Sequence, residues 1–285
     1  MSDLQIVRTI PELRATLRVW RAAGQRIALV PTMGALHDAH MALMQAGRAR
    51  ADRVVATIFV NPTQFAAHED LDTYPRREAQ DIEKLRADGI DLLFAPEAGE
   101  VYPDGFATTV TVAGVSEGLC GEYRPGHFEG VATVVTKLLL QALPDIALFG
   151  EKDYQQLQVI RRLTWDLDIP VEIAGVPTVR EADGLAMSSR NLHLSEAERA
   201  IAPRLHETLA GVAEQIIAGT SPEAACAAGR AQLVESGFEP VEYLELRHAE
   251  TLDVPTQPLD ASTPCRLLAA VWLGDTRLID NIAVG

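Results

Sequence analysis

Short apolar runs alternate with amphipathic segments over the first two thirds of the chain. Runs of aliphatic and β-branched residues predict buried strands, and apolar positions at helical spacing predict helices between them. We expect strands over residues 27–30, 54–60, 91–95, 145–149 and 171–176, and helices over residues 40–50, 76–88, 131–140 and 155–166. Strands that alternate with helices indicate βαβ units with right-handed crossovers. The pattern therefore predicts an α/β fold with a Rossmann-like, doubly wound parallel sheet.

The pattern changes after about residue 180. Ser195-Glu196-Ala197-Glu198 matches a capping box and predicts a long helix to about Ile217, and Ser221-Pro222-Glu223 predicts the start of another. Three apolar runs follow, at residues 241–246, 266–272 and 277–284, and Gly274-Asp275 predicts a hairpin turn between the last two. We expect residues 1–180 to form the Rossmann-like domain and residues 181–285 to form a smaller α+β domain.

Composition and charge narrow the function. The chain has 285 residues, of which 47% are hydrophobic, so it can build a real core. Its formal net charge of −15 argues against binding to nucleic acid and to anionic membrane surfaces, because both are held by clustered Lys and Arg. Three scattered cysteines and no basic-apolar leader at the N-terminus suit a cytoplasmic protein with reduced thiols. No apolar run reaches the ~20 residues that a membrane helix needs.

The first segment with candidate chemistry is PTMGALHDAH, residues 31–40, which follows a predicted strand and opens a helix. Histidines three residues apart share one helix face, and there they join the free N–H groups and positive dipole of the helix start. Such a place suits a phosphate group. Alternatively, one histidine only caps the helix and the other lies on the surface. A zinc site is the weaker interpretation, because no third ligand is evident.

Two further segments carry polar groups that suit a small ligand. Asn61-Pro62-Thr63-Gln64-Phe65 follows the next strand, and the Gln64 amide can bind a hydroxyl or a carboxylate. Asn-Pro also ends a strand for purely structural reasons. Arg124-Pro125-Gly126-His127-Phe128-Glu129-Gly130 reads as a loop whose Arg124 and His127 could cover an anion, although a surface loop explains it as well.

The last two segments suit a polyphosphate. In Gly150-Glu151-Lys152-Asp153-Tyr154-Gln155-Gln156, Lys152 can neutralise phosphate charge and Asp153 can hold a hydrated Mg²⁺, or cap a helix. Residues 179–191 end in Met187-Ser188-Ser189-Arg190-Asn191, whose hydroxyl groups and guanidinium can bind phosphates. Alternatively, this segment only links two domains. Most of these segments follow the carboxyl ends of parallel strands, which share one sheet edge. We therefore expect a single site there.

The segments PTMGALHDAH, FVNPTQF, RPGHFEGV, FGEKDYQQ and DGLAMSSRN occur in the order and spacing of a known family. The chain resembles the pantothenate synthetases, nucleotidyltransferases that carry an HxGH motif on a class I synthetase-like fold. This resemblance implies that the carboxylate of pantoate attacks the α-phosphate of ATP to give pantoyl adenylate. The amine of β-alanine then displaces AMP to give pantothenate. It further implies a homodimer and Mg²⁺ with the ATP.

The resemblance also assigns residues. It implies His40 as proton donor. Because displacement at phosphorus depends on stabilising the charge of the phosphoryl oxygens, we expect His37, Lys152 and Arg190 as the other catalytic groups. Gln64 and Gln156 match the glutamines that bind pantoate, and Asn61, Arg124 and His127 join them as substrate-binding candidates. Asp153 is the metal candidate. The positions expected to contact ATP are Met33, Gly34, Ala35, Leu36, His37, Asp38, Ala39, His40, Gly150, Glu151, Lys152, Asp153, Val179, Met187, Ser188, Ser189 and Arg190.

One departure and three alternatives accompany this assignment. The third position of HxGH is Ala39 here, and its methyl group could crowd the nucleotide that glycine lets approach closely. The first alternative, a nucleotidyltransferase with a phosphorylated acceptor, leaves Gln64 and Gln156 without a role. The second, an aminoacyl-tRNA synthetase-like fragment, conflicts with the charge. The third, an inactive nucleotide-binding protein, conflicts with the presence of both histidines, Lys152 and Arg190.

Overall fold

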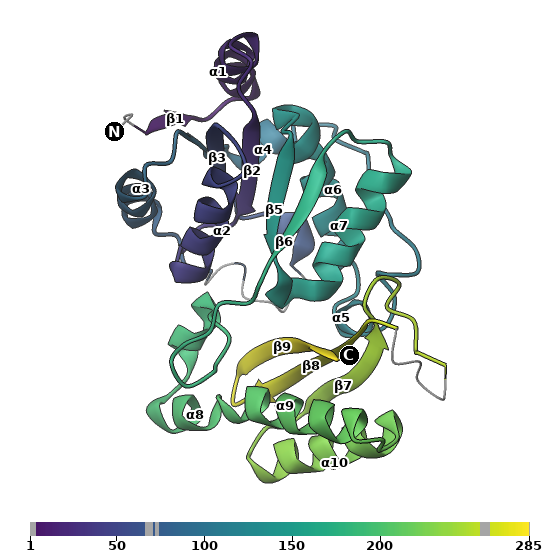
Figure 1. Ribbon diagram of the computed structural model, residues 1–285. Coiled ribbons are helices and arrows are strands. Elements are labelled where there is room, and N and C mark those ends of the chain that lie inside the picture. The colour runs from purple at the N-terminus through teal and green to yellow at the C-terminus, as the bar shows by residue number, and fades with distance from the viewer. Residues whose placement is uncertain (1–3, 66–70, 72–73, 257–262, 285) are drawn as a thin grey trace.

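In the computed structural model the chain forms two parts, each built around one sheet (Figure 1). The structure describes residues 4–65, 71, 74–256 and 263–284. The expected absence of a secretory leader rests partly on residues 1–3, which lie outside the described residues. Within the described residues, no helix is both long and apolar enough to cross a membrane.

The first sheet is entirely parallel and has the order β1-β4-β3-β2-β5-β6. Its strands are β1 (Gln5–Val7), β2 (Ile27–Thr32), β3 (Arg53–Ile58), β4 (Leu92–Phe94), β5 (Ile146–Gly150) and β6 (Glu172–Val176). The helices of this part are α1 (Ile10–Ala22), α2 (Asp38–Arg48), α3 (Glu78–Ala87), α4 (Ala98–Val101), α5 (Cys120–Tyr123), α6 (His127–Ala142) and α7 (Tyr154–Asp166), with single turns η1 (Pro62–Gln64) and η2 (Glu151–Asp153).

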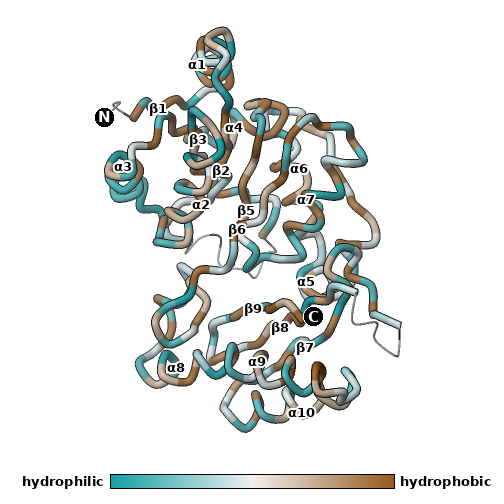
Figure 2. Tube along the Cα trace, in the orientation of Figure 1, coloured by the Kyte–Doolittle hydropathy of each residue, from teal (hydrophilic) through white to brown (hydrophobic). Residues whose placement is uncertain are grey.

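Helices cover both faces of this sheet, as the predicted doubly wound fold requires. Along β2, Ile27 and Leu29 join a core cluster with α1, α6 and α7, while Ala28 and Val30 join another with α2 and α3. Successive strand residues point to opposite faces, so a continuously apolar strand is buried on both sides. Figure 2 shows this as hydrophobic strands between helices of mixed character.

The second part is a three-stranded antiparallel sheet with helices on one face. It comprises η3 (Ser189–His193), α8 (Glu196–Ile201), α9 (Arg204–Ile217), α10 (Pro222–Glu235), β7 (Val241–His248), β8 (Cys265–Leu273) and β9 (Thr276–Val284). On β8, Leu267 and Ala269 pack with α9 and α10, whereas Leu268 and Ala270 belong to the core cluster of the first part. The second sheet therefore packs against the first part with the face that its own helices leave uncovered.

Most predicted elements are confirmed, and several differ. The helix expected from Ser195 to Ile217 is two helices, because Pro203 lacks an N–H and clashes with the preceding turn. The segment expected as a loop over residues 124–130 is wrong in part, since α6 begins at His127. β1 and α1 were not expected, although Thr9 and Glu12 form a capping box at the start of α1. The domain boundary near residue 180 stays a prediction, and residue 180 itself lies between β6 and α8.

Gly130 lets α6 approach the turn η1. A Cβ added to it would lie 2.4 Å from the Thr63 carbonyl oxygen and 2.7 Å from the Gln64 Cα. We expect Gly130→Ala to lower the free energy of unfolding by ~1–3 kcal/mol, because the backbone must move. Gly211 in α9 has no atom within 4 Å of such a Cβ, so Gly211→Ala should stabilise by up to ~1 kcal/mol. Thermal denaturation of both variants tests this, and equal melting temperatures would contradict it.

Candidate active site

A cavity of about 520 Å³ lies between the two parts, a size typical of small-molecule sites. It is formed at the carboxyl ends of β2, β3, β5 and β6 and by β8 and β9 of the second sheet. β2 and β5 are neighbours whose following helices, α2 and α7, cover opposite faces, so the cavity lies where the strand order reverses. The predicted residues that line it are Met33, His37, Ala39, His40, Asn61, Gln64, Arg124, His127, Gly150, Lys152, Asp153, Gln156, Val179, Met187, Ser188, Ser189 and Arg190.

The two histidines meet at the start of α2. The backbone N–H of His37 donates to His40 Nδ1 at 3.2 Å, and the ring centroids are 4.1 Å apart. Burial, aided by Lys152 and Lys84, lowers the pKa of His37 to about 4, and burial with His37 and Lys152 lowers the pKa of His40 to about 3. Both rings are therefore neutral near pH 7. Because Nδ1 of His40 accepts, its proton lies on Nε2, which makes His40 a neutral hydrogen-bond donor.

A buried carboxylate that the sequence did not indicate holds the loop before α2. Asp81, only 1% exposed, accepts the N–H groups of Ala35 and Leu36, each at 2.8 Å. Lys84 donates to the Leu36 carbonyl. These two amides are thus already bonded within the protein. Gly34, Ala35, Leu36 and Asp38, although expected to contact ATP, are not among the residues that line the cavity.

Lys152 lies in the turn after β5 and directs its ammonium group toward the segment between the two parts. Its Nζ donates to the Met187 carbonyl at 2.9 Å. Burial lowers the pKa of Lys152 to about 8, although Asp153 and Asp280 favour the charged form. Its neighbour Glu151 does not line the cavity and instead pairs with Arg266 at 3.1 Å. Asp153 precedes α7 but makes no side-chain cap hydrogen bond, so its exposed carboxylate is not a helix cap.

Asn61 serves the structure of its loop. This residue, 1% exposed, donates from its side chain to Gln64 Oε1 at 3.0 Å and to the Gly130 carbonyl at 3.2 Å, and it accepts from the Tyr102 hydroxyl at 2.8 Å. Its amide hydrogens are thus engaged within the protein, and one of them binds the side chain of Gln64 at the cavity wall.

His127 similarly supports its neighbours. Its Nδ1 lies 2.9 Å from the Gln64 carbonyl oxygen, and its Nε2 lies 3.0 Å from an Arg124 guanidinium nitrogen. Since a carbonyl only accepts and a guanidinium only donates, one neutral tautomer protonated on Nδ1 satisfies both contacts. His127 thereby links the backbone at Gln64 to Arg124 at the cavity wall.

The adjacent glutamines of α7 have different tasks. Gln155 is buried and bridges the segment before α5: it accepts from Cys120 N–H at 2.9 Å and donates to the Val115 and Gly118 carbonyls at 3.1 Å. Gln156 lines the cavity from the first turn of the same helix. The carboxamides of Gln64 and Gln156 therefore enter the cavity wall from different elements.

The segment between the two parts is an ordered hairpin. Arg180 pairs with Ala186 as a β-bridge, and Met187 N–H donates to the Val179 carbonyl at 3.0 Å. Ser188 caps the turn η3 by accepting from Arg190 N–H at 3.3 Å. This segment is therefore a wall of the cavity as well as a connection. Among the described residues, no group of three His, Cys, Asp or Glu side chains could hold a metal ion.

Known proteins resemble this chain over nearly its whole length. Residues 5–283 match the family Pantoate-beta-alanine ligase. The pantothenate synthetase of Paramagnetospirillum magneticum is 57% identical over 281 residues, covering 99% of this chain and 98% of that protein, and that of Rhodospirillum rubrum is 53% identical over 284 residues, covering 100% of both. The structure of pantothenate synthetase from Thermus thermophilus has a TM-score of 0.90 and 46% identity, with 98% of each chain covered. Pantoate-beta-alanine ligase from Francisella tularensis, complexed with beta-gamma ATP and β-alanine, has a TM-score of 0.79 and 33% identity, covering 98% of this chain and 97% of that chain.

The lowered pKa of Lys152 predicts a pH dependence of ATP binding. As the pH rises through about 8, Lys152 loses its charge and the affinity should fall, and binding of the anionic phosphates should take up a proton. Calorimetric titration in buffers of different ionisation enthalpy measures this uptake. In Lys152→Arg the guanidinium stays charged, so the uptake near pH 8 should vanish. Unchanged uptake in that variant would contradict the assignment.

Ala39 allows a second test. It lies in the first turn of α2 and lines the cavity, where its helical conformation carries no strain. We expect Ala39→Gly to change the KM for ATP by less than about tenfold, or ~1.4 kcal/mol. Steady-state kinetics decide, and a larger fall in KM would mean that the methyl group crowds the nucleotide.

Proposed function

The chain belongs to the pantoate–β-alanine ligase family, and from this premise we propose which residues of the cavity perform each step of the reaction. The protein is an ATP-dependent ligase that condenses pantoate with β-alanine and releases AMP and pyrophosphate through a pantoyl-adenylate intermediate. One observation carries the assignment of residues: both histidines, Lys152, Arg190, Gln64 and Gln156 line one cavity at the reversal of the sheet.

In the first step the pantoate carboxylate attacks the α-phosphate of ATP, and pyrophosphate leaves. Such a displacement depends on positioning and on stabilising the charge of the phosphoryl oxygens. We assign charge stabilisation to Lys152 and Arg190. His37 and His40, being neutral, donate hydrogen bonds, and Nε2 of His40 takes the role that the family resemblance describes as proton donor.

The backbone and side chains around these groups complete the nucleotide site. Met33, Ala39 and Gly150 supply one wall and Val179, Met187, Ser188 and Ser189 the other. Asp81 acts indirectly, because its hydrogen bonds to two loop amides set the path of the chain into α2.

Pantoate binds between the carboxamides of Gln64 and Gln156 in this proposal. A carboxamide both donates and accepts, so it can bind the hydroxyl groups as well as the carboxylate of pantoate. Asn61 and His127 hold Gln64 in place from opposite sides of its residue, through its side chain and its backbone. Arg124 is linked to this pair through His127 and can attract the carboxylates of the substrates.

In the second step the amine of β-alanine attacks the acyl carbon of the adenylate, and AMP leaves. Because AMP is a good leaving group, a free amine reacts without a strong base. The larger demand is to exclude water, which would hydrolyse the adenylate. The hairpin over residues 179–187 and the second sheet border the cavity on the side away from the first sheet, and they are suited to this task.

Mg²⁺ would enter with ATP. Mg²⁺ is commonly held by one or two carboxylates together with substrate phosphates and water. The exposed carboxylate of Asp153 lines the cavity and fits that pattern, whereas no group of three or more His, Cys, Asp or Glu side chains that could hold a metal ion occurs among the described residues. The ion would neutralise phosphate charge, and Asp153 would orient it.

Three broader properties belong to the same proposal. Residues 1–180 form the catalytic domain, and residues 181–285 form a lid domain. The protein is a homodimer through its N-terminal part and acts in the cytoplasm. The apolar side chains at the ends of α6 and α7 support the dimer, since Trp165 is 82% exposed and Leu143 and Leu167 are about half exposed.

Release of pyrophosphate tests the order of the steps. With Mg-ATP and pantoate alone, we expect a stoichiometric burst, and addition of β-alanine should convert it to steady turnover with AMP as a product. The burst arises because the adenylate stays bound until an amine arrives. Quenched-flow measurement of pyrophosphate checks this result. Pyrophosphate release that never depends on pantoate would contradict the substrate assignment.

The same assay tests the catalytic groups. Lys152→Ala and His40→Ala should each slow single-turnover adenylation by ~10²–10³-fold, the scale of losing a donor to a developing oxyanion. Lys137→Ala serves as the control, because Lys137 lies over the rings of Tyr102 and Phe106 and does not line the cavity. Its adenylation rate should stay near that of the unmodified protein. Near-normal rates in both active-site variants would refute these roles.

A further inference from the structure

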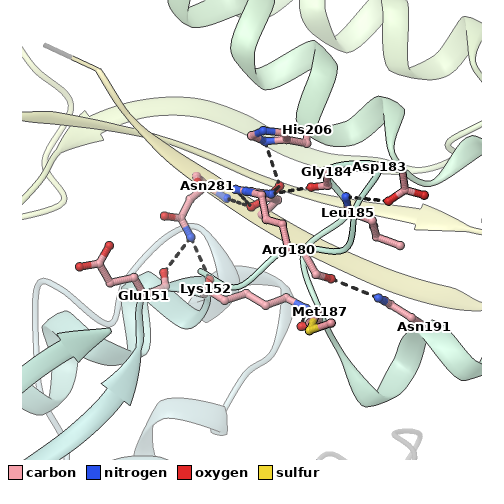
Figure 3. A network of polar contacts seen from close by, with 12 residues as sticks. Glu151, Lys152, Arg180, Asp183, Gly184, Leu185, Met187, Asn191, His206 and Asn281 are labelled. Atoms are coloured by element: carbon pink, nitrogen blue, oxygen red, sulfur yellow. Dashed lines mark hydrogen bonds and ion pairs between the residues drawn. The ribbon is translucent and has the colours of Figure 1, made fainter. Parts of the chain in front are cut away.

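Asn281 on β9 holds the backbone of the turn that carries Lys152. The residue is 2% exposed, and its Nδ2 donates to the carbonyl oxygens of Glu151 and Lys152, each at 2.9 Å (Figure 3). A carboxamide nitrogen carries two hydrogens, so each carbonyl receives one. A strand of the second sheet thus binds two successive peptide groups of the first part.

The orientation of this carboxamide is fixed by Arg266. The Arg266 Nε donates to Asn281 Oδ1 at 2.6 Å. If the amide were flipped, its NH2 group would face the Arg266 Nε–H, and two donors would be opposed. Arg266 is held in turn by Glu151 at 3.1 Å and by stacking 4.3 Å from the Tyr154 ring. Both polar atoms of the Asn281 side chain therefore have partners, and these partners belong to η2 and β8.

The ammonium end of Lys152 depends on the same strand by another route. Its Nζ donates to the Met187 carbonyl, at the base of the hairpin over residues 179–187. Arg180 of that hairpin forms a bidentate pair with the buried Asp280, at 2.6 and 2.9 Å. Asp280 and Asn281 are adjacent on β9, so the contacts close into a ring from β9 to Lys152, to the hairpin and back to β9 (Figure 3).

We propose that Asn281 is a positioning residue for adenylation, which fixes Lys152 through the backbone of η2 when the second sheet packs against the first part. This inference rests on the role proposed above for Lys152. Its physical basis is that a displacement of a charged group by about 1 Å can cost a factor of ~10² in rate. The Asn281 amide bonds to the main chain of Lys152 and not to its ammonium, so its effect passes through the backbone.

Asn281→Asp tests this role with little change of shape. The carboxylate keeps an acceptor for Arg266 but cannot donate, and its second oxygen would face the two carbonyl oxygens. We expect single-turnover pyrophosphate release from Mg-ATP and pantoate to slow by ~10–100-fold. The second step, started from added pantoyl adenylate and β-alanine, should change by less than about threefold, because the proposal assigns charge stabilisation by Lys152 to the first step only.

Val284→Ala is the matched control on the same strand. Val284 is buried in the cluster that β9 shares with α9 and α10, and it does not line the cavity. This variant should lower the melting temperature while leaving the ratio of the two step rates unchanged. Slowing of both steps alike in Asn281→Asp, as in a generally destabilised protein, would overturn the proposal.

A double-mutant cycle separates this inference from the role of Lys152. In a Lys152→Ala background, Asn281→Asp should cause no further slowing of adenylation, because its effect passes through Lys152. If Asn281→Asp slowed adenylation in this background by as much as it does alone, the proposal would be overturned. The proposal would also be overturned if Lys152→Ala adenylated slowly while Asn281→Asp adenylated at a normal rate. Near-normal adenylation by Lys152→Ala alone would overturn the role of Lys152, and this inference with it.

Discussion

The active site depends on one constraint of topology, the parallel pairing of β2 with β5. The chain passes from β2 to one face of the sheet and from β5 to the other, so α2 and α7 diverge as they leave adjacent strands. A crevice therefore remains between the first turns of α2 and α7, because each helix packs on its own face of the sheet. Both turns consequently face the same space, and the residues that follow each strand become neighbours across it.

Burial then determines the electrostatics of that space. The chain carries a formal charge of −15, yet the groups at the cavity include two neutral histidines and Lys152, whose pKa is lowered to about 8. Desolvation disfavours each positive charge, and the positive groups disfavour one another. The negative charge of an incoming polyphosphate offsets both effects by attraction. The site is therefore arranged to bind anions despite the net charge of the whole protein, and neutral imidazoles add hydrogen bonds without adding repulsion.

The sequence indicated the sheet, and the meeting of the polar segments at one cavity, because their signals are local. Apolar runs marked β2, β3 and β5, and the polar segments that follow these strands had to meet once the strands were parallel. Local signals do not reveal long-range partners. Asp81 in α3 and Asn281 in β9 look like ordinary surface and strand residues in the sequence, yet each holds a loop of the site. Asn61, His127, Ala35 and Leu36 were expected to contact ligands. In the structure the side chains of Asn61 and His127 and the amides of Ala35 and Leu36 form hydrogen bonds within the protein, which the spacing of the residues does not reveal.

The packing of β8 has a consequence for folding. Leu267 and Ala269 point toward α9 and α10, while Leu268 and Ala270 complete the core of the first part. One strand therefore contributes to two cores, and separation of the parts exposes apolar surface of both at ~25 cal/mol per Å². Loss of a β8 side chain from either cluster therefore weakens the packing of a strand on which the other cluster also depends. We expect this shared strand to couple the stability of the two parts.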